Sequence, residues 1–350
     1  MAQTTAAAPS WPRARLNLSA YGERIAAYIV LSAVAVWLGA NLLHSPSDFF
    51  SSIVFGLGNG ALYALIALGY SLVYGIIELI NFAHGDLFML GTLLSVVVVT
   101  TIFGQTAMGA AGWLAFAAAL VVVALFCASI NVTIEFLAYR RLRHAPKLAP
   151  LITAVGMSFI LQFVGLKWNG SGQKQSPSVL PTGHFEIGGV RVYTNMLVVL
   201  AVTIPILFLM TYIVTRTRAG KAMRATAQDP DAARLMGVNV NKIISFTFGV
   251  GGALAGIAGV MYQQVIGTTR YDLGLQLGLM AFTAAVLGGI GSLPGAVLGG
   301  LLIGVIQGLN EGVAYGAGQR WTQSVVFSIL ILFMVFKPAG LLGQSLREKV

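Results

Sequence analysis

The sequence predicts an all-α, polytopic membrane protein of about ten transmembrane passes, some of them broken or re-entrant. Its 350 residues are 57% hydrophobic and 9% charged, whereas about a quarter of the residues in a soluble domain are charged. The apolar residues gather in runs of about 20 residues, the length that an α-helix needs to cross a bilayer. The basic residues gather between these runs, where they can set the orientation of the chain in a membrane.

The apolar runs define the expected passes, several of them short. They cover residues 25–43, 53–77, 87–103, 113–137, 150–167, 196–214, 243–267, 275–292, 295–314 and 322–336. At residues 78–86 and 288–295, neighbouring runs are joined by a few residues without a basic anchor. A broken or re-entrant helix is expected at either junction if protein or a water-filled cavity satisfies its backbone.

The distribution of lysine and arginine predicts cytoplasmic N- and C-termini. With the N-terminus inside, only five of the 21 basic residues fall on the outer face: Lys167, Lys174, Arg191, Arg270 and Arg320. The net charge of +10 is then a consequence of membrane topology, and no nucleic-acid partner is expected. The single Cys127 allows no intrachain disulfide.

The predicted organisation is one transmembrane domain, residues 25–340, between cytoplasmic tails at residues 1–24 and 341–350. An external loop at 168–195 carries a predicted hairpin around Gly188-Gly189. We interpret this loop as a connection, with a docking surface for an extracytoplasmic partner as the alternative. The longest basic inner loop covers residues 215–242.

Glycines recur at intervals of four residues in the predicted helices. Gly56 and Gly60 share this spacing, and so does the series Gly300, Gly304, Gly308, Gly312 and Gly316. In a membrane helix, such a series forms a smooth ridge on which another backbone can approach closely. We therefore expect close helix packing there rather than a ligand site.

A short helix is predicted inside the basic inner loop. Asp229 is a good N-cap, Pro230 suits the first helical position and Asp231 suits the positive end of the helix dipole. Gly237 suits the left-handed residue that ends a helix. Between them lie the helix-forming residues Ala232, Ala233, Leu235 and Met236. About two turns do not persist in water without packing, so the segment is either a linker helix or the place where another protein binds.

The densest polar group beside a predicted pass consists of Glu78, Asn81, His84 and Asp86. Ionisable groups at membrane depth usually face the bundle interior or a cavity, so these residues either line a solute path or form an interfacial turn in which Asp86 caps the next helix. No metal site is expected with a single histidine. Smaller candidates, for which helix packing is the favoured interpretation and the solute path the alternative, are Tyr63, Tyr70, Tyr74, Gln162, Gln263, Gln264, Asn310 and Glu311.

Catalytic and nucleotide-binding motifs are missing from the sequence. It contains neither a Gly-x-x-x-x-Gly-Lys-Ser/Thr loop nor a His-Glu-x-x-His pair. The chain is therefore expected to be no enzyme and to bind no cofactor. If ATP drives it, another subunit must bind the nucleotide.

Several stretches resemble the permeases of branched-chain amino-acid ABC transporters. They are Asn59–Tyr70, Ile80–Asp86, Gly220–Gly259 and Leu287–Gly300, and the likeness covers about residues 50–340. The family usually has Glu in place of Asp86. Permeases for urea or short amides look similar over the same motifs, and they stay open as an alternative solute class.

This resemblance implies the partners and the inner membrane of a bacterium. A second permease subunit of similar fold, forming a heterodimer, two ATPase subunits that bind ATP and Mg, and an external solute-binding protein would complete the transporter. The Asp231-Ala232-Ala233 and Gly237 spacing is similar to the Glu-Ala-Ala-x-x-x-Gly loop that docks on the ATPase in such importers, although the Ile-x-Leu-Pro ending is absent. Asp229 and Leu235 would belong to the same coupling helix, and Tyr63, Asn81, His84 and Asp86 to the solute path.

Two other classes of protein remain alternatives. A secondary transporter or a channel would work without an ATPase. An intramembrane enzyme would need a converging acid, base or nucleophile, with His84 and Asp86 as its candidates.

Overall fold

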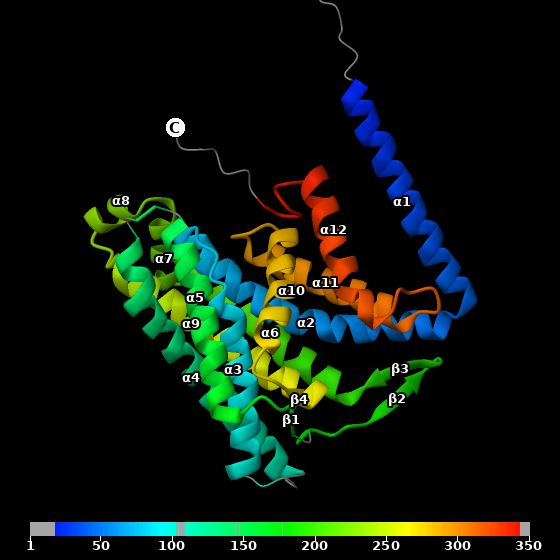
Figure 1. The fold of residues 1–350 in the computed structure, drawn as a ribbon, viewed down its shortest axis with the longest axis horizontal. Coiled ribbons are helices and arrows are strands. Elements are labelled where there is room, and N and C mark those ends of the chain that lie inside the picture. The colour runs from blue at the N-terminus through cyan, green and yellow to red at the C-terminus, as the bar shows by residue number, and fades with distance from the viewer. Residues whose placement is uncertain are drawn as a thin grey trace, which may run out of the picture. The chain divides into compact units, whose positions relative to one another are not determined.

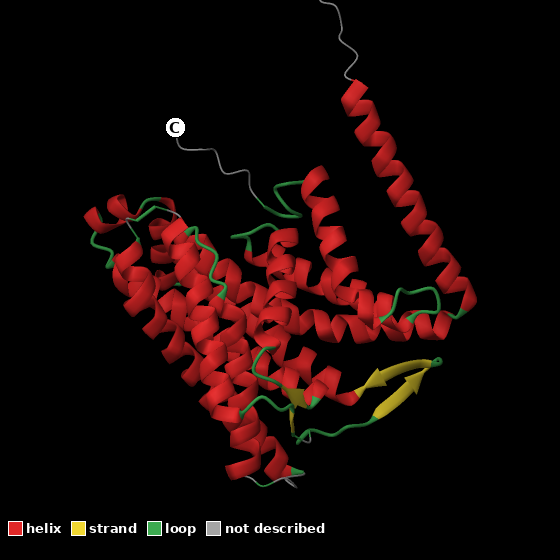
Figure 2. Cartoon of the chain, in the orientation of Figure 1, coloured by secondary structure: helices red, strands yellow, loops and turns green. Residues whose placement is uncertain are grey.

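The structure is a computed structural model that describes residues 18–102, 104, 109–143, 145–146, 148–176 and 178–343. It is helical almost throughout (Figures 1 and 2). Most of the predicted N-terminal tail and residues 344–350 of the predicted C-terminal tail lie outside these ranges.

The first helix forms a unit of its own that ends at His44. Helix α1 (Leu18–His44) contains the apolar stretch Tyr28–His44, which is shorter than a full span. Large apolar side chains such as Leu31 and Val36 are exposed along it, which fits a helix in contact with lipid.

The second unit, residues 45–350, contains the other helices. Its apolar helices are α2 (Pro46–Ile77), α3 (Ala83–Val97), α4 (Ala110–Ile134), α5 (Leu148–Asn169), α6 (Thr194–Arg216), α9 (Val240–Ile266), α10 (Leu273–Gly288), α11 (Leu293–Gly312) and α12 (Thr322–Phe336). Helix α3 continues as the π-helical turn η1 (Val98–Ile102) and α4 as η2 (Glu135–Tyr139) and the 3₁₀ turn η3 (Arg140–Leu142). Eight helices of the described chain are long and apolar enough to cross a membrane, and Tyr28–His44 and Leu273–Gly288 are shorter apolar helices. Each predicted pass thus corresponds to one helix.

Short turns separate the helices at the two uncertain junctions. Helix α2 ends at Glu78, whose φ of 53° is left-handed, and α3 begins at Ala83. Helices α10 and α11 are joined through Gly289 and Gly291, with φ of 103° and 87°. At both junctions a few non-helical residues therefore separate two distinct helices.

The loop at residues 168–195 contains the predicted hairpin. Strands β2 (His184–Ile187) and β3 (Val190–Tyr193) pair antiparallel with Ile187 opposite Val190. Gly188 and Gly189 both have positive φ, as a two-residue turn of this kind requires. A second antiparallel pair joins β1 (Lys174–Gln175) to β4 (Thr268–Thr269) and fastens the loop to the end of α9.

The helices differ in how much of their apolar surface the chain itself covers. In the most apolar window of α2, 78% of the residues are buried, against 17% in α6 and 11% in α12. The largest buried side chains include Leu65 and Leu68 of α2, Phe88 of α3 and Phe248 of α9. Helices α2, α3 and α9 thus form the interior, while α6 and α12 expose apolar faces that suit lipid or a membrane partner.

Glycines allow α2 and α11 to pack backbone against backbone. A Cβ added to Gly60 would lie 2.8 Å from Leu301 Cα, and one added to Gly300 would lie 2.6 Å from Ala64 Cα. The same holds for Gly56, whose added Cβ would lie 2.7 Å from Gly304 O. The regular spacing in the sequence thus marks a real helix contact, which we call the α2–α11 seam.

Enlarging a glycine of the seam should destabilise the protein. In Gly300→Leu the new side chain would collide with the α2 backbone, and overpacking of this kind costs about 1–3 kcal/mol. Gly156→Leu in α5 is the matched control, because no atom lies within 4 Å of an added Cβ there. We expect a lower thermal unfolding midpoint in detergent for Gly300→Leu alone. Equal midpoints would contradict the close packing.

Candidate functional site

The predicted coupling segment folds as its sequence indicates. Helix α7 (Arg218–Gln228) is followed by α8 (Pro230–Leu235). The Asp229 carboxylate accepts hydrogen bonds from the backbone N–H of Asp231 (2.9 Å) and Ala232 (3.0 Å), and Gly237 has a φ of 80°. The predicted N-cap and helix stop are therefore confirmed.

Helix α8 presents an apolar tip on a polar segment. The side chains of Leu235 and Met236 are 89% and 84% exposed, whereas Ala233 is buried. Asp231 and Arg234 form an ion pair of 2.7 Å on the helix surface. Ala233 therefore anchors the helix, and its exposed apolar pair is available to a partner.

A cavity of about 390 Å³ lies directly beside α8. We call it the α8 cavity. Pro230, Asp231 and Arg234 line it together with Glu78 at the end of α2 and Tyr139 at the end of α4. The coupling segment thus shares a cavity with the turn between α2 and α3.

A buried carboxylate, which the sequence reasoning did not single out, ties this end of the bundle together. Glu135 is fully buried, and Arg140 Nη2 lies 2.7 Å from its Oε2. Arg143 pairs with Oε1, and the Ser245 hydroxyl donates to Oε2 at 2.7 Å. Burial lowers the pKa of Arg143, while the charge of Glu135 opposes that shift. As the only acidic residue in the run 113–137, Glu135 could have been found from its cost at membrane depth.

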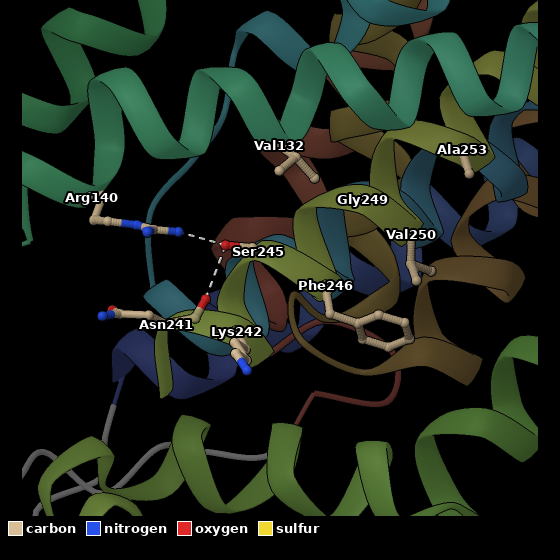
Figure 3. A pocket seen from close by; sticks show the side chains of 9 residues that line it. All are labelled: Val132, Arg140, Asn241, Lys242, Ser245, Phe246, Gly249, Val250 and Ala253. Atoms are coloured by element: carbon tan, nitrogen blue, oxygen red, sulfur yellow. Dashed lines mark hydrogen bonds between the residues drawn. The ribbon is translucent and has the colours of Figure 1, made fainter. Parts of the chain in front are cut away.

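Hydrogen bonds from the same charged groups join the end of α4 to α9. Figure 3 shows Arg140 extending from the end of α4 to Ser245, which also bonds the backbone O of Asn241 one turn earlier in α9. Beside them, a groove of about 540 Å³ is lined by apolar groups such as Val132 and Phe246. If the start of α9 moves, the end of α4 must therefore move with it, or the hydrogen bonds between them must break.

Asn81 belongs to a chain of buried hydrogen bonds. The Tyr139 hydroxyl donates to Asn81 Oδ1 at 2.8 Å. The Asn81 amide lies 3.5 Å from Asn131 Oδ1, and Asn131 donates in turn to the backbone O of Phe248 at 2.7 Å. The α2–α3 turn is thereby bound to both α4 and α9.

His84 and Asp86 are fully buried and line neither the α8 cavity nor the second cavity described below. The His84 ring packs against Tyr70, with centroids 4.7 Å apart. Asp86 Oδ2 accepts from the Ser158 hydroxyl at 2.5 Å, which links α3 to α5. Helix α3 has no side-chain cap, so Asp86 does not have the capping role that was considered for it.

A second cavity, of about 340 Å³, opens at the other half of α2. We call it the Tyr63 cavity. The Tyr63 hydroxyl donates to Gln307 Oε1 at 2.6 Å, and Gln307 Nε2 donates to Glu311 Oε1 at 3.1 Å. Thr322 also donates to Glu311 Oε1, at 2.8 Å, so α2, α11 and α12 meet around one carboxylate. Gln307 was missed in the sequence, where a single amide in an apolar helix carries little signal.

The structure thus divides the four predicted path residues among three places. Tyr63 lies at one cavity, Asn81 bonds to Tyr139 at the other, and His84 and Asp86 lie in the packed layer. Along α2, the rise from Tyr63 to Ile76 at the α8 cavity is about 20 Å, and residues 64–73 between them are buried. Their role in solute passage stays a prediction.

The sequence of this chain matches a family model and several known proteins. Residues 52–335 match the family model described as branched-chain amino acid transport system / permease component. The chain is 40% identical over 309 residues to the high-affinity branched-chain amino acid transport system permease protein BraD of Pseudomonas aeruginosa, and 38% identical over 307 residues to LivH of Escherichia coli K12. Both alignments cover 86% of this chain and 98% of the relative. The fructose import permease protein FrcC of Rhizobium meliloti is 30% identical over 156 residues, which are 43% of this chain and 41% of FrcC.

Neutralising Glu135 should destabilise the α8 end of the bundle. Glu135→Gln leaves Arg140 and Arg143 without their counter-charge, and breaking a buried ion pair costs about 3 kcal/mol. We expect a marked fall in the thermal midpoint. The control is Glu186→Gln in the hairpin, because its ion pair with Arg191 is exposed and is worth about 1 kcal/mol at most. A Glu135→Gln midpoint as high as that of the control would contradict this role.

Proposed function

This chain belongs to the family of branched-chain amino acid transport system permease components, and from that membership we propose that it moves branched-chain amino acids across the membrane as a subunit of an ABC importer. The observation that carries the proposal is the near full-length match to relatives whose names state high-affinity branched-chain amino acid transport. The likeness to a fructose permease covers less than half of each chain and supports the fold more than the solute.

The proposed assembly contains a second permease subunit of the same family, forming a heterodimer, two ATPase subunits that bind ATP and Mg, and an external solute-binding protein. It lies in the inner membrane of a bacterium, with both termini of this chain in the cytoplasm. The exposed apolar faces of α6 and α12 leave room for a membrane partner. The described residues contain no group of three or more potential metal ligands, and no cofactor is proposed for this chain.

We assign the ATPase contact to the segment Asp229–Gly237 within the cytoplasmic loop 215–242. Leu235 and Met236 would enter the ATPase cleft, while Asp229 and buried Ala233 hold the helix in shape. A short, capped helix with an exposed apolar tip can be pushed or pulled as a rigid body, because its own hydrogen bonds are satisfied within the segment.

The route from this contact to the bundle passes through the α8 cavity. Arg234 and Tyr139 line the same cavity, and Tyr139 holds Asn81 in the α2–α3 turn. A displacement of α8 would therefore move the walls of this cavity. Through Tyr139 and Asn81, it would also exert force on the α2–α3 turn. Opening of the α8 cavity and closing of the Tyr63 cavity at the far end would together give ATP-driven alternating access.

Uptake measurements test the solute. Cells that lack this protein and then regain it should recover uptake of labelled leucine, isoleucine and valine. Urea and a short amide serve as comparison solutes, since permeases for these compounds resemble the same motifs. Recovery of urea uptake without leucine uptake would overturn the amino-acid assignment. Full uptake by this chain purified without any ATPase would favour a secondary transporter.

Replacing Leu235 by Asp should uncouple the permease from its ATPase. The side chain is exposed, so the fold should change little, whereas a charge placed in an apolar interface should weaken ATPase binding roughly tenfold or more. Leu235→Met keeps the apolar contact and is the matched control. The measurements are co-purification of the ATPase and solute uptake. Wild-type values for Leu235→Asp in both would contradict the assignment.

A further inference from the structure

The Tyr63 cavity has the chemistry of a site for an aliphatic amino acid. Among the residues that line it, Glu311 is the only charged one. Apolar side chains, including Leu62, Leu277 and Met280, form another part of its wall. A volume of about 340 Å³ falls at the small end of the range for ligand sites, about 300–1,000 Å³.

The Glu311 carboxylate accepts hydrogen bonds through only one of its two oxygens. Both of its hydrogen bonds, from Gln307 and Thr322, reach Oε1. In the part of the chain that the structure describes, neither a hydrogen bond to Oε2 nor an ion pair of Glu311 is found. A carboxylate that lines a cavity can bind an ammonium group by a charge-assisted hydrogen bond, which is stronger than a neutral one.

Hydrogen-bond donors for the other end of an amino acid line the same cavity. Gln276 and Gln323 contribute side-chain amides to it, and neither amide is bonded to another described residue. Tyr63 and Gln307 are already bonded to each other and hold Glu311 in place. The wall thus offers one anionic acceptor, free amide donors and an apolar surface, which match the ammonium, carboxylate and side chain of a branched-chain zwitterion.

We propose that the Tyr63 cavity is a transient solute site of this permease, with Glu311 binding the ammonium group of an aliphatic amino acid. The inference rests on the proposed function and extends it to a residue and a solute group. The site lies at the half of α2 that also contacts the external hairpin, where Arg191 N donates to Ser51 Oγ at 3.0 Å. In the proposed topology this is the outer side, where the binding protein releases its solute.

The test uses the complete transporter, with its partner permease and ATPases, reconstituted in proteoliposomes with the solute-binding protein outside. Glu311→Gln should reduce the rate of leucine uptake roughly tenfold or more, because a hydrogen bond to a charged group is lost. Co-purification of the partners and the ATPase activity stimulated by the binding protein should be retained. Asp48→Asn is the matched control, since it removes a carboxylate from the same half of α2 outside the cavity; it should transport like the wild type.

A second measurement detects occupancy without relying on transport. In Gln319→Cys, which leaves the proposed ligands in place, a membrane-impermeant thiol reagent should label the cavity wall, while the native Cys127 is buried. Leucine supplied with the binding protein should slow this labelling several-fold. The same protection should be lost when Glu311→Gln is added.

The outcomes separate the two proposals. A wild-type transporter that moves no leucine overturns the proposed function. A transporter that moves leucine, with wild-type uptake in Glu311→Gln and no protection of Gln319→Cys, overturns this inference alone. Loss of the partner permease in Glu311→Gln also overturns it, because the carboxylate would then hold a subunit rather than a solute.

Discussion

Close backbone contact between α2 and α11 is the constraint on which the rest of the structure depends. Lipid is as apolar as a leucine side chain, so membrane helices gain little from hiding apolar surface from one another, and they associate through packing. Small residues at Gly56, Gly60, Gly300 and Gly304 bring the two backbones within reach of each other. Helix α2 can then lie in the interior, where its two halves contribute to cavities at opposite ends.

Helices α2 and α9 each line both cavities. In α2, Tyr63 lines the Tyr63 cavity and Ile76 the α8 cavity. In α9, Tyr262 lines the Tyr63 cavity and Phe248 the α8 cavity. Between the cavities lies a tightly packed layer, so a solute could pass only if the helices shift relative to one another. The network of Glu135, Arg140 and Ser245 attaches the start of α9 to α4, near the segment proposed to contact the ATPase. Force applied at α8 would thus reach the same two helices that shape the far cavity.

The polar residues within and between the apolar helices fall into two kinds. Asn81, His84 and Asp86 form contacts that hold helices together, and their partners lie in the protein: Tyr139 for Asn81, the Tyr70 ring for His84 and Ser158 for Asp86. Asp86 Oδ1 and both ring nitrogens of His84 have no hydrogen-bond partner, but they are enclosed in the packed layer. Glu311 differs because its unused oxygen belongs to a residue that lines a cavity. A sequence shows all of them as polar residues in apolar runs. Only the packing distinguishes a polar group that is enclosed between helices from one that borders a cavity and is available to a ligand.

Local sequence by itself determined the passes, the hairpin at Gly188-Gly189 and the capped helix at Asp229–Gly237, because bilayer thickness, turn geometry and helix capping act over short stretches of chain. The resemblance of the motifs to a transport family was likewise visible in the residues, and the family match bears it out. Tertiary structure decided which polar residues meet. It placed Tyr63 beside Gln307 and Glu311, far from Asn81, and it joined Glu135 to Ser245. Those pairings link residues from separate helices, and side-chain periodicity within one helix carries no record of which neighbour it will face.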